Sequence, residues 1–188
     1  MVGSVAQRRE ARVGEIVAAA WELALEHGIA GLSLHALARA VGIRQPSLYA
    51  YFDSKHALYD AMFADGNRRL LERLDALTLP SDPRAAVHAF MHAFVDFAVE
   101  DTARCALLFQ RPIPGFEPSA ASFAYAQAVL ARAVDMLRAA GLERDGDVDC
   151  FVAMVAGLID AQISNDPGGD RWVRHLDRLT DVYLDELP

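Results

Sequence analysis

The residues with the clearest chemical potential lie between Gly42 and Phe63, in the stretch GIRQPSLYAYFDSKHALYDAMF. This segment holds a proline, three tyrosines and Lys55, the only lysine of an acidic chain. Arginine and glutamine side chains can form hydrogen bonds with base edges in the major groove of DNA, whereas hydroxyl groups and a lysine can hold phosphates. These residue types therefore suit a surface that contacts double-stranded DNA.

Two short helices joined by a tight turn are expected to position this surface. Ser33 can cap the helix LHALARA, which ends before Gly42, and Pro46 lies near the first turn of the next helix, where its missing amide costs nothing. A steep crossing needs a small residue on the first helix, supplied by Ala38, and a glycine in the turn. The second helix is then expected to present five side chains outward: Arg44, Gln45, Ser47, Tyr49 and Tyr51.

Apolar spacing and helix-breaking residues predict an all-α chain of about nine helices. A three-helix, helix-turn-helix domain is expected over residues 1–54, and a larger helical domain over residues 55–188. The other expected helices are Glu10–His27, Lys55–Leu77, Asp82–Glu100, the segment TARCALLF, Ser119–Ala140, Asp147–Ser164 and Asp170–Leu187.

Net charge does not exclude DNA as a partner. The chain carries −8 in total, but residues 1–58 contain six basic and five acidic groups, a balance of +1, which leaves −9 on the remainder. Charges are screened beyond about 8 Å at physiological salt, so a local patch can bind DNA on an acidic protein. Arg8, Arg9 and Arg12 are candidates for phosphate contacts from an N-terminal arm, and a solvated arm is the alternative.

The segments IVAAAWELALEHGIAGLS and SLHALARAVGIRQPSLYAYFDSKHAL together resemble the first helix and the helix-turn-helix of the TetR family of bacterial transcriptional regulators. The resemblance implies that Arg44, Gln45 and Ser47 face bases or nearby phosphates. It implies that the phosphate backbone is held by Tyr49, Tyr51 and Lys55. Ser33 and Leu34 match positions where the family often has two hydroxyl residues, and Leu34 departs from that pattern. His35 matches an outward position.

A small-molecule effector site is expected in the larger domain. The helix DPRAAVHAFMHAFVDFAVE is apolar on nearly all sides, which predicts burial on more than one face, and the TetR resemblance implies an inducer in this part of the chain. Plain core packing is the alternative for each aromatic residue. The candidates are His88, Phe90, Met91, His92, Phe94, Phe109, Phe116, Phe123, Gln127 and Met154.

A homodimer is also expected, because one short recognition helix makes too few contacts for tight specific binding. The last two helices carry apolar stripes, and the resemblance implies a four-helix dimer interface there. Packing within a single chain is the alternative. The candidates are Val152, Val155, Ala156, Ile159, Ile163, Trp172, Leu176, Leu179, Val182 and Tyr183.

One enzyme hypothesis stays open: His88, His92 and Asp96 recur at a spacing that could place three metal ligands on one helical face. No catalytic residue or cofactor is otherwise expected, since the chain lacks HExxH, GxSxG and a phosphate-binding glycine loop. Cys105 and Cys150 are expected as buried, reduced thiols. No membrane span or signal peptide is evident, which favours a cytoplasmic protein.

The sequence therefore favours a TetR-like repressor that an effector releases from a palindromic operator. The alternatives are a DNA-binding regulator without small-molecule input, an activator, and the metal-dependent enzyme.

Overall fold

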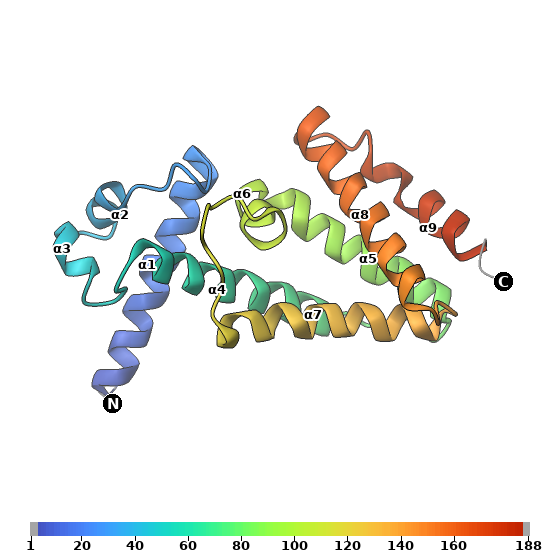
Figure 1. The fold of residues 1–188 in the computed structure, drawn as a ribbon, viewed down its shortest axis with the longest axis horizontal. Helices are drawn as coiled ribbons and strands as arrows, with labels where there is room; N and C mark the ends of the chain where they lie inside the picture. The colour runs from blue at the N-terminus through green and yellow to red at the C-terminus, as the bar shows by residue number, and fades with distance from the viewer. Residues whose placement is uncertain (1–3, 186–188) are drawn as a thin grey trace. The chain divides into compact units, whose positions relative to one another are not determined.

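The computed structural model describes residues 4–185, except for the side chain of Asp145. Over these residues the chain forms nine α-helices and no strand, which confirms the all-α prediction (Figure 1). The helices are α1 (Val5–His27), α2 (Leu34–Ala40), α3 (Gln45–Leu48), α4 (Lys55–Asp75), α5 (Pro83–Glu100), α6 (Thr102–Cys105), α7 (Ala120–Ala139), α8 (Asp145–Asn165) and α9 (Leu176–Asp185).

The helices form two compact units. The first takes in the chain up to Asn67 together with Ala103–Ala124, and the second takes in Arg68–Thr102 and the chain from Tyr125 onward. The boundary predicted between residues 54 and 55 falls at the start of α4, within the first unit. The functional division into a DNA-binding and an effector-binding domain stays a prediction.

The first unit is built on a row of apolar side chains from α1. Trp21 is buried, and its indole Nε1 donates a hydrogen bond to Asp65 on α4 at 3.0 Å. Gly66 allows a close approach on the same helix, because a Cβ there would lie 3.1 Å from a methyl carbon of Leu108. This core fixes α1 against α4 and supports α2 and α3. Its fully buried members include Ile16, Leu32, Leu37, Leu48, Leu58 and Met62.

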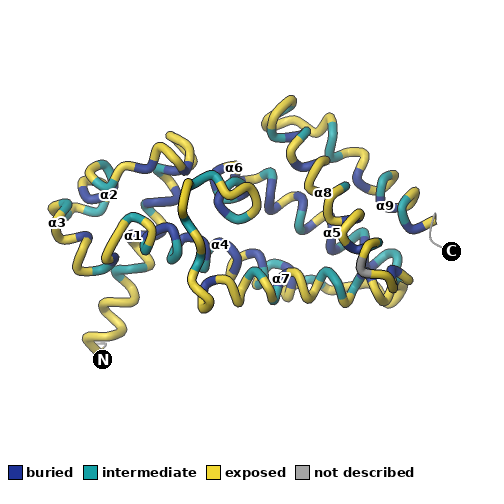
Figure 2. Tube along the Cα trace, in the orientation of Figure 1, coloured by how far each residue is buried: buried dark blue, intermediate teal, exposed yellow. Residues whose placement is uncertain are grey.

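The second unit packs α5, α8 and α9 together (Figure 1). Figure 2 shows buried positions along α5, as its apolar sequence predicts. Hydrogen bonds between side chains join helices at the surface of this unit. Arg73 donates two to Glu100, and Arg132 donates two to Asp75. The hydrogen bond from Arg132 is the main reason that the pKa of Asp75 lies below its usual range.

Two helix starts differ from the sequence prediction by at least five residues. α1 starts five residues before Glu10, because Ser4 and Gln7 form a reciprocal capping box. The last helix starts later than Asp170: a turn and a short 3-10 helix, Val173–His175, precede α9. Buried Gln162 holds that turn by accepting hydrogen bonds from the amides of Trp172 and Val173. The predicted helix end at Leu187 lies outside the described residues.

The two cysteines differ in environment. Cys105 is buried as expected, but Cys150 is exposed on α8, so that prediction was wrong for Cys150. Among the described residues, no helix is long and apolar enough to cross a membrane.

Candidate nucleic-acid interface

The turn between α2 and α3 has the geometry that the sequence predicts. The hydroxyl of Ser33 accepts a hydrogen bond from the Ala36 amide at 3.4 Å and caps α2. At the other end Gly42 has a φ of 70°, a backbone conformation that side chains disfavour. The amide of Ile43 reaches back to the Ala38 carbonyl at 2.9 Å, and the Gly42 amide bonds to the Arg39 carbonyl at 3.2 Å. This pair of bonds is a Schellman motif, which ends α2 and sends the chain sharply into α3.

The helix after this turn is shorter than the sequence suggests. α3 has four residues, with Pro46 in its first turn. Beyond Leu48 the amides of Tyr49, Ala50 and Tyr51 bond to carbonyls three residues back, so the chain tightens into turns. The prediction that Tyr49 and Tyr51 lie on the helix itself is therefore wrong: both follow it. Tyr49 is nevertheless 49% exposed, and Tyr51 is half-buried.

Most of the predicted DNA-binding side chains are at the surface of this unit. Those classed as exposed are Ser33, His35, Arg44, Pro46, Ser47 and Tyr49, and those that are half-buried are Gln45, Tyr51 and Lys55. Lys55 opens α4, and its Nζ lies 5.4 Å from the ring centroid of Tyr59. The Tyr59 hydroxyl in turn donates to the Ile29 carbonyl at 3.2 Å, which fixes the ring beneath the lysine. Their roles on DNA stay predictions.

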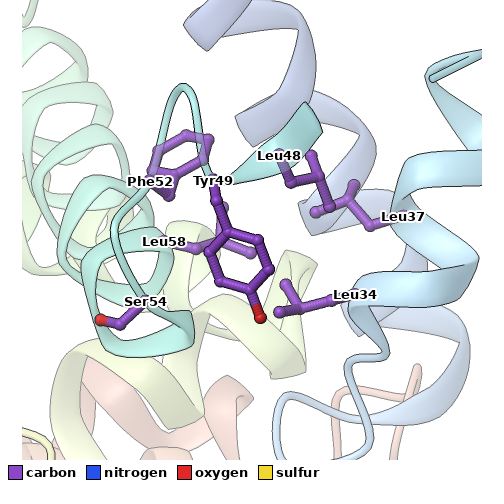
Figure 3. Close-up of a pocket in the computed structure, with 7 residues that line it drawn as sticks. All are labelled: Leu34, Leu37, Leu48, Tyr49, Phe52, Ser54 and Leu58. Atoms are coloured by element: carbon purple, nitrogen blue, oxygen red, sulfur yellow. The ribbon is translucent and has the colours of Figure 1, made fainter. Parts of the chain in front are cut away.

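A small hollow opens beside Tyr49 (Figure 3). Its lining is almost wholly apolar, and the close-up shows the Tyr49 ring among the side chains of Leu34, Leu48 and Leu58. A volume of about 10 Å³ matches roughly one water molecule, which is too small for an effector. Leu34, which departs from the TetR pattern, thus packs beside Tyr49 where the family often has a hydroxyl residue.

Two arginines on α1 contact this region in a way that the sequence did not reveal. Arg12 donates to the carbonyl of Val41 and also pairs with Glu15. Arg9 donates to the carbonyl of Ala50 at 3.2 Å, and its guanidinium carbon lies 5.9 Å from the Tyr51 ring centroid. The sequence signal was their three-residue spacing, which places both on one face of α1. Neither belongs to a flexible arm, because α1 already begins at Val5.

The predicted effector-pocket residues fall into both compact units. In the first unit, Phe116 packs edge-on against Tyr59 and Phe63, while Phe109 and Phe123 are 42% and 46% exposed. In the second unit, Phe90 and Met91 are buried in the core, Phe94 and Met154 are half-buried, and Gln127 is exposed. An effector site made from these residues stays a prediction.

The remaining two pocket candidates, His88 and His92, face α9. His88 lies 3.0 Å from Asp177 through Nδ1 and 2.9 Å from Asp181 through Nε2, and His92 Nε2 lies 2.7 Å from the same oxygen of Asp177. Partial burial works to raise the pKa of Asp177, but hydrogen bonds from His92 and His88 outweigh it, so this pKa is lowered. Asp96 is exposed and takes no part in these contacts.

These contacts bear on the metal hypothesis. The histidines are hydrogen-bonded to carboxylates of α9, and the described residues contain no group of three or more side chains arranged to hold a metal ion. The structure therefore gives the metal-dependent enzyme no support.

The residues predicted to form the dimer interface differ in how far they are buried within the single chain. Val155, Ile159 and Leu176 are buried within the single chain, whereas Val152 and Ala156 are exposed. Ile163, Trp172, Leu179 and Tyr183 are half-buried, and Val182 is 53% exposed. The Tyr183 hydroxyl donates to the Asp147 carbonyl at 2.6 Å, and burial is the main reason that its pKa is raised.

Comparison with known proteins is consistent with this geometry over most of the chain. Residues 16–62 match the family model described as bacterial regulatory proteins, tetR family, and residues 87–187 match that of the tetracyclin repressor-like C-terminal domain. A curated relative is the HTH-type transcriptional regulator Rv1816 of Mycobacterium tuberculosis, 34% identical over 118 residues. That match covers 60% of this chain and 50% of the relative, so the chain spans about half the length of the curated relatives it matches.

Solved structures share the fold, and two of them were determined with a bound partner. One is BioQ with its double-stranded DNA operator, at a TM-score of 0.63 and 24% identity, covering 92% of this chain and 96% of that one. The other is a TetR variant from Acinetobacter baumannii in complex with minocycline, at a TM-score of 0.62 and 22% identity, covering 92% and 93%.

Proposed function

Because the chain belongs to the TetR family of bacterial regulatory proteins, we propose that it is a transcriptional regulator that binds a palindromic DNA operator as a homodimer and is released by a small-molecule effector. The observation that carries this proposal is the surface around α3. A Schellman turn and a capped α2 position a short helix that carries Gln45 and Ser47, with Arg44 at its N-cap and Tyr49 and Lys55 after it.

The chemistry of this surface fits two tasks. Arg44 and Gln45, at the start of α3, have the donors and acceptors that distinguish base pairs in the major groove. Ser47, Tyr49 and Lys55 have the hydroxyl and ammonium groups that hold phosphates without reading sequence. BioQ, which has the same fold, is a protein solved with its operator, and this supports DNA as the partner here.

The dimer follows from the size of the surface. A four-residue recognition helix offers few base contacts, and two copies on a palindrome double them. We place the dimer contact on the exposed positions of the last two helices, Val152, Ala156 and Val182, because the other strongly apolar candidates are buried within the chain or partly so.

Effector release is supported by the apolar character of α5 and by the minocycline complex of a protein with the same fold. An effector can release DNA only by binding the two conformations with different affinity. We propose that the effector binds within the second unit near Phe90, Met91 and Met154. The protein then acts on its operator in the cytoplasm.

Selection from a random pool of DNA duplexes tests the proposal. We expect the purified protein to enrich a palindrome whose half-sites lie about one helical turn, or a multiple of it, apart. A library of small molecules is then screened for release of that duplex. Failure to enrich any sequence would overturn the DNA-binding function, whereas enrichment without release by any compound would favour a regulator without small-molecule input.

A further inference from the structure

Arg9 and Arg12 contact backbone carbonyls on either side of α3, whose surroundings, residues 43–52, are called the recognition segment below. Arg12 donates to Val41, the residue before the turn glycine, and Arg9 donates to Ala50, which follows α3. Carbonyls at helix ends have no partner within their own helix, and these two are satisfied by guanidinium groups from α1. Cations are also favoured at helix C-termini by the helix dipole.

The recognition segment needs this support because it is short. Four residues are far below the length at which a helix is stable by itself, so the orientation of α3 depends on what holds its flanks. On one flank the Schellman turn sets the entry angle. Arg12 fixes that turn to α1 while Glu15 orients its guanidinium, and Arg9 fixes the exit while lying against Tyr51.

We propose that Arg9 and Arg12 are positioning residues that set the orientation of the recognition segment, and that neither neutralises DNA phosphates. This inference rests on the proposed DNA-binding function. It assigns the N-terminal arginines a role different from the phosphate contacts that the sequence suggests. The side chain of their neighbour Arg8 is exposed and makes no hydrogen bond or ion pair within the described residues, so Arg8 provides a matched control for loss of charge.

The first experiment uses the free protein and needs no DNA. Amide hydrogen exchange over residues 43–52 is compared in wild type, Arg9→Gln, Arg12→Gln and Arg8→Gln. We expect exchange to become about tenfold faster in the first two variants and to stay unchanged in Arg8→Gln, since about 1.4 kcal/mol corresponds to a factor of ten and charged hydrogen bonds are of this size. Unchanged exchange in both Arg9→Gln and Arg12→Gln would overturn the inference, whether or not the protein binds DNA.

The second experiment measures affinity for a duplex selected by the wild type, over a series of salt concentrations. Loss of one phosphate contact reduces the slope of log affinity against log salt by about 0.9, whereas loss of a positioning residue lowers affinity and leaves the slope unchanged. We expect Arg9→Gln and Arg12→Gln to bind about tenfold more weakly at every salt concentration, and Lys55→Gln to reduce the slope.

The variant Arg12→Lys separates the two roles further. It keeps the positive charge but lacks the forked guanidinium that reaches Glu15 and Val41 together. We expect it to bind as weakly as Arg12→Gln. Wild-type affinity in Arg12→Lys, or reduced salt slopes in the arginine variants, would overturn the inference, while a wild type that prefers no DNA sequence would instead overturn the proposed function.

Discussion

At the scale of single residues, Gly42 is held to glycine by its backbone conformation. Its φ of 70° allows the Schellman turn, and a Cβ placed there would meet no atom within 4 Å. The cost of a side chain at this position therefore comes from the backbone alone. The same reasoning does not apply to Gly14, which lies within α1 in a helical conformation with open space around it.

Gly42→Ala is expected to destabilise the protein by about 1–2 kcal/mol, because alanine disfavours the left-handed conformation. Gly14→Ala is the matched control, and we expect it to stabilise by up to about 1 kcal/mol, since alanine is the better helix former. Urea unfolding followed by circular dichroism measures both. Equal effects of the two substitutions would contradict the role assigned to the turn.

Asp60 is a second residue whose hydrogen bonds predict how a substitution changes stability. Its carboxylate accepts hydrogen bonds from the Ser119 amide at 2.7 Å and from the hydroxyls of Ser119 and Ser122 at 2.9 and 2.8 Å. Asn provides one acceptor oxygen in place of two, so Asp60→Asn should destabilise by about 1–2 kcal/mol. Urea unfolding measures the change.

Asp82→Asn serves as the control for Asp60→Asn. Asp82 caps α5 through a single bond from the Ala85 amide at 2.8 Å, and asparagine is an equally good capping residue. We expect little change in its unfolding midpoint. If the two variants lost the same stability, the three-bond arrangement at Asp60 would not be the cause.

At the scale of elements, α5 and α9 face each other through arginine, histidine and aspartate side chains at four-residue spacing. Arg84, His88 and His92 on α5 meet three carboxylates of α9: Asp177, Asp181 and Asp185. The pKa of Asp177 is lowered in the folded chain. Its ionised form therefore stabilises the fold above the ordinary pKa of an aspartate, and this contribution is lost as the pH falls through the lowered folded value.

We expect the free energy of unfolding of Asp177→Asn to fall less steeply than that of the wild type as the pH is lowered. The Asp177 side chain is 60% exposed, so solvent screening limits the effect to below about 1 kcal/mol at neutral pH. Urea midpoints between pH 7 and pH 3 measure it, with exposed Asp149→Asn on α8 as the control. If the urea midpoint of Asp177→Asn fell with pH as steeply as that of the wild type, the carboxylate would not couple α9 to α5.

The elements were predictable from the sequence wherever a local signal sets them. Ser33, Asp82 and Gly42 mark helix ends through their own side chains or backbone, and each boundary is confirmed. α3 and α9 were predicted too long, each for its own reason. Buried Gln162 holds the turn before α9, and three-residue hydrogen bonds tighten the chain after Leu48, neither of which leaves a periodic pattern.

The residue types on the surface around α3 could be predicted from the sequence, but the contacts that position this surface could not. The exposed residues around α3 carry donors and rings that local sequence reveals, whereas Arg9 and Arg12 act through backbone carbonyls that lie 41 and 29 positions away in the chain. A backbone carbonyl has no residue type, so the sequence gives no sign of its partner. The apolar stripe on the last two helices was ambiguous for a different reason, because core and interface positions have the same composition.

At the scale of the whole molecule, the proposed dimer depends on side chains that the single chain leaves exposed. Val152 is 44% exposed on α8. An aspartate placed there would be desolvated in a dimer contact, so we expect Val152→Asp to sediment as a monomer where the wild type sediments as a dimer. Val5→Asp, at a valine that is 76% exposed on α1, should remain dimeric. A dimeric Val152→Asp or a monomeric wild type would contradict the interface.

Sequence-specific DNA binding by the surface around α3 is the central property proposed for this protein. The most direct measurement is fluorescence anisotropy of wild type, Arg44→Ala and Gln45→Ala on the selected duplex and on a shuffled one. We predict that the wild type prefers the selected duplex by about a thousandfold or more, and that each variant loses roughly 1–3 kcal/mol of that preference. Equal affinity of the wild type for both duplexes, or full preference in both variants, would contradict it.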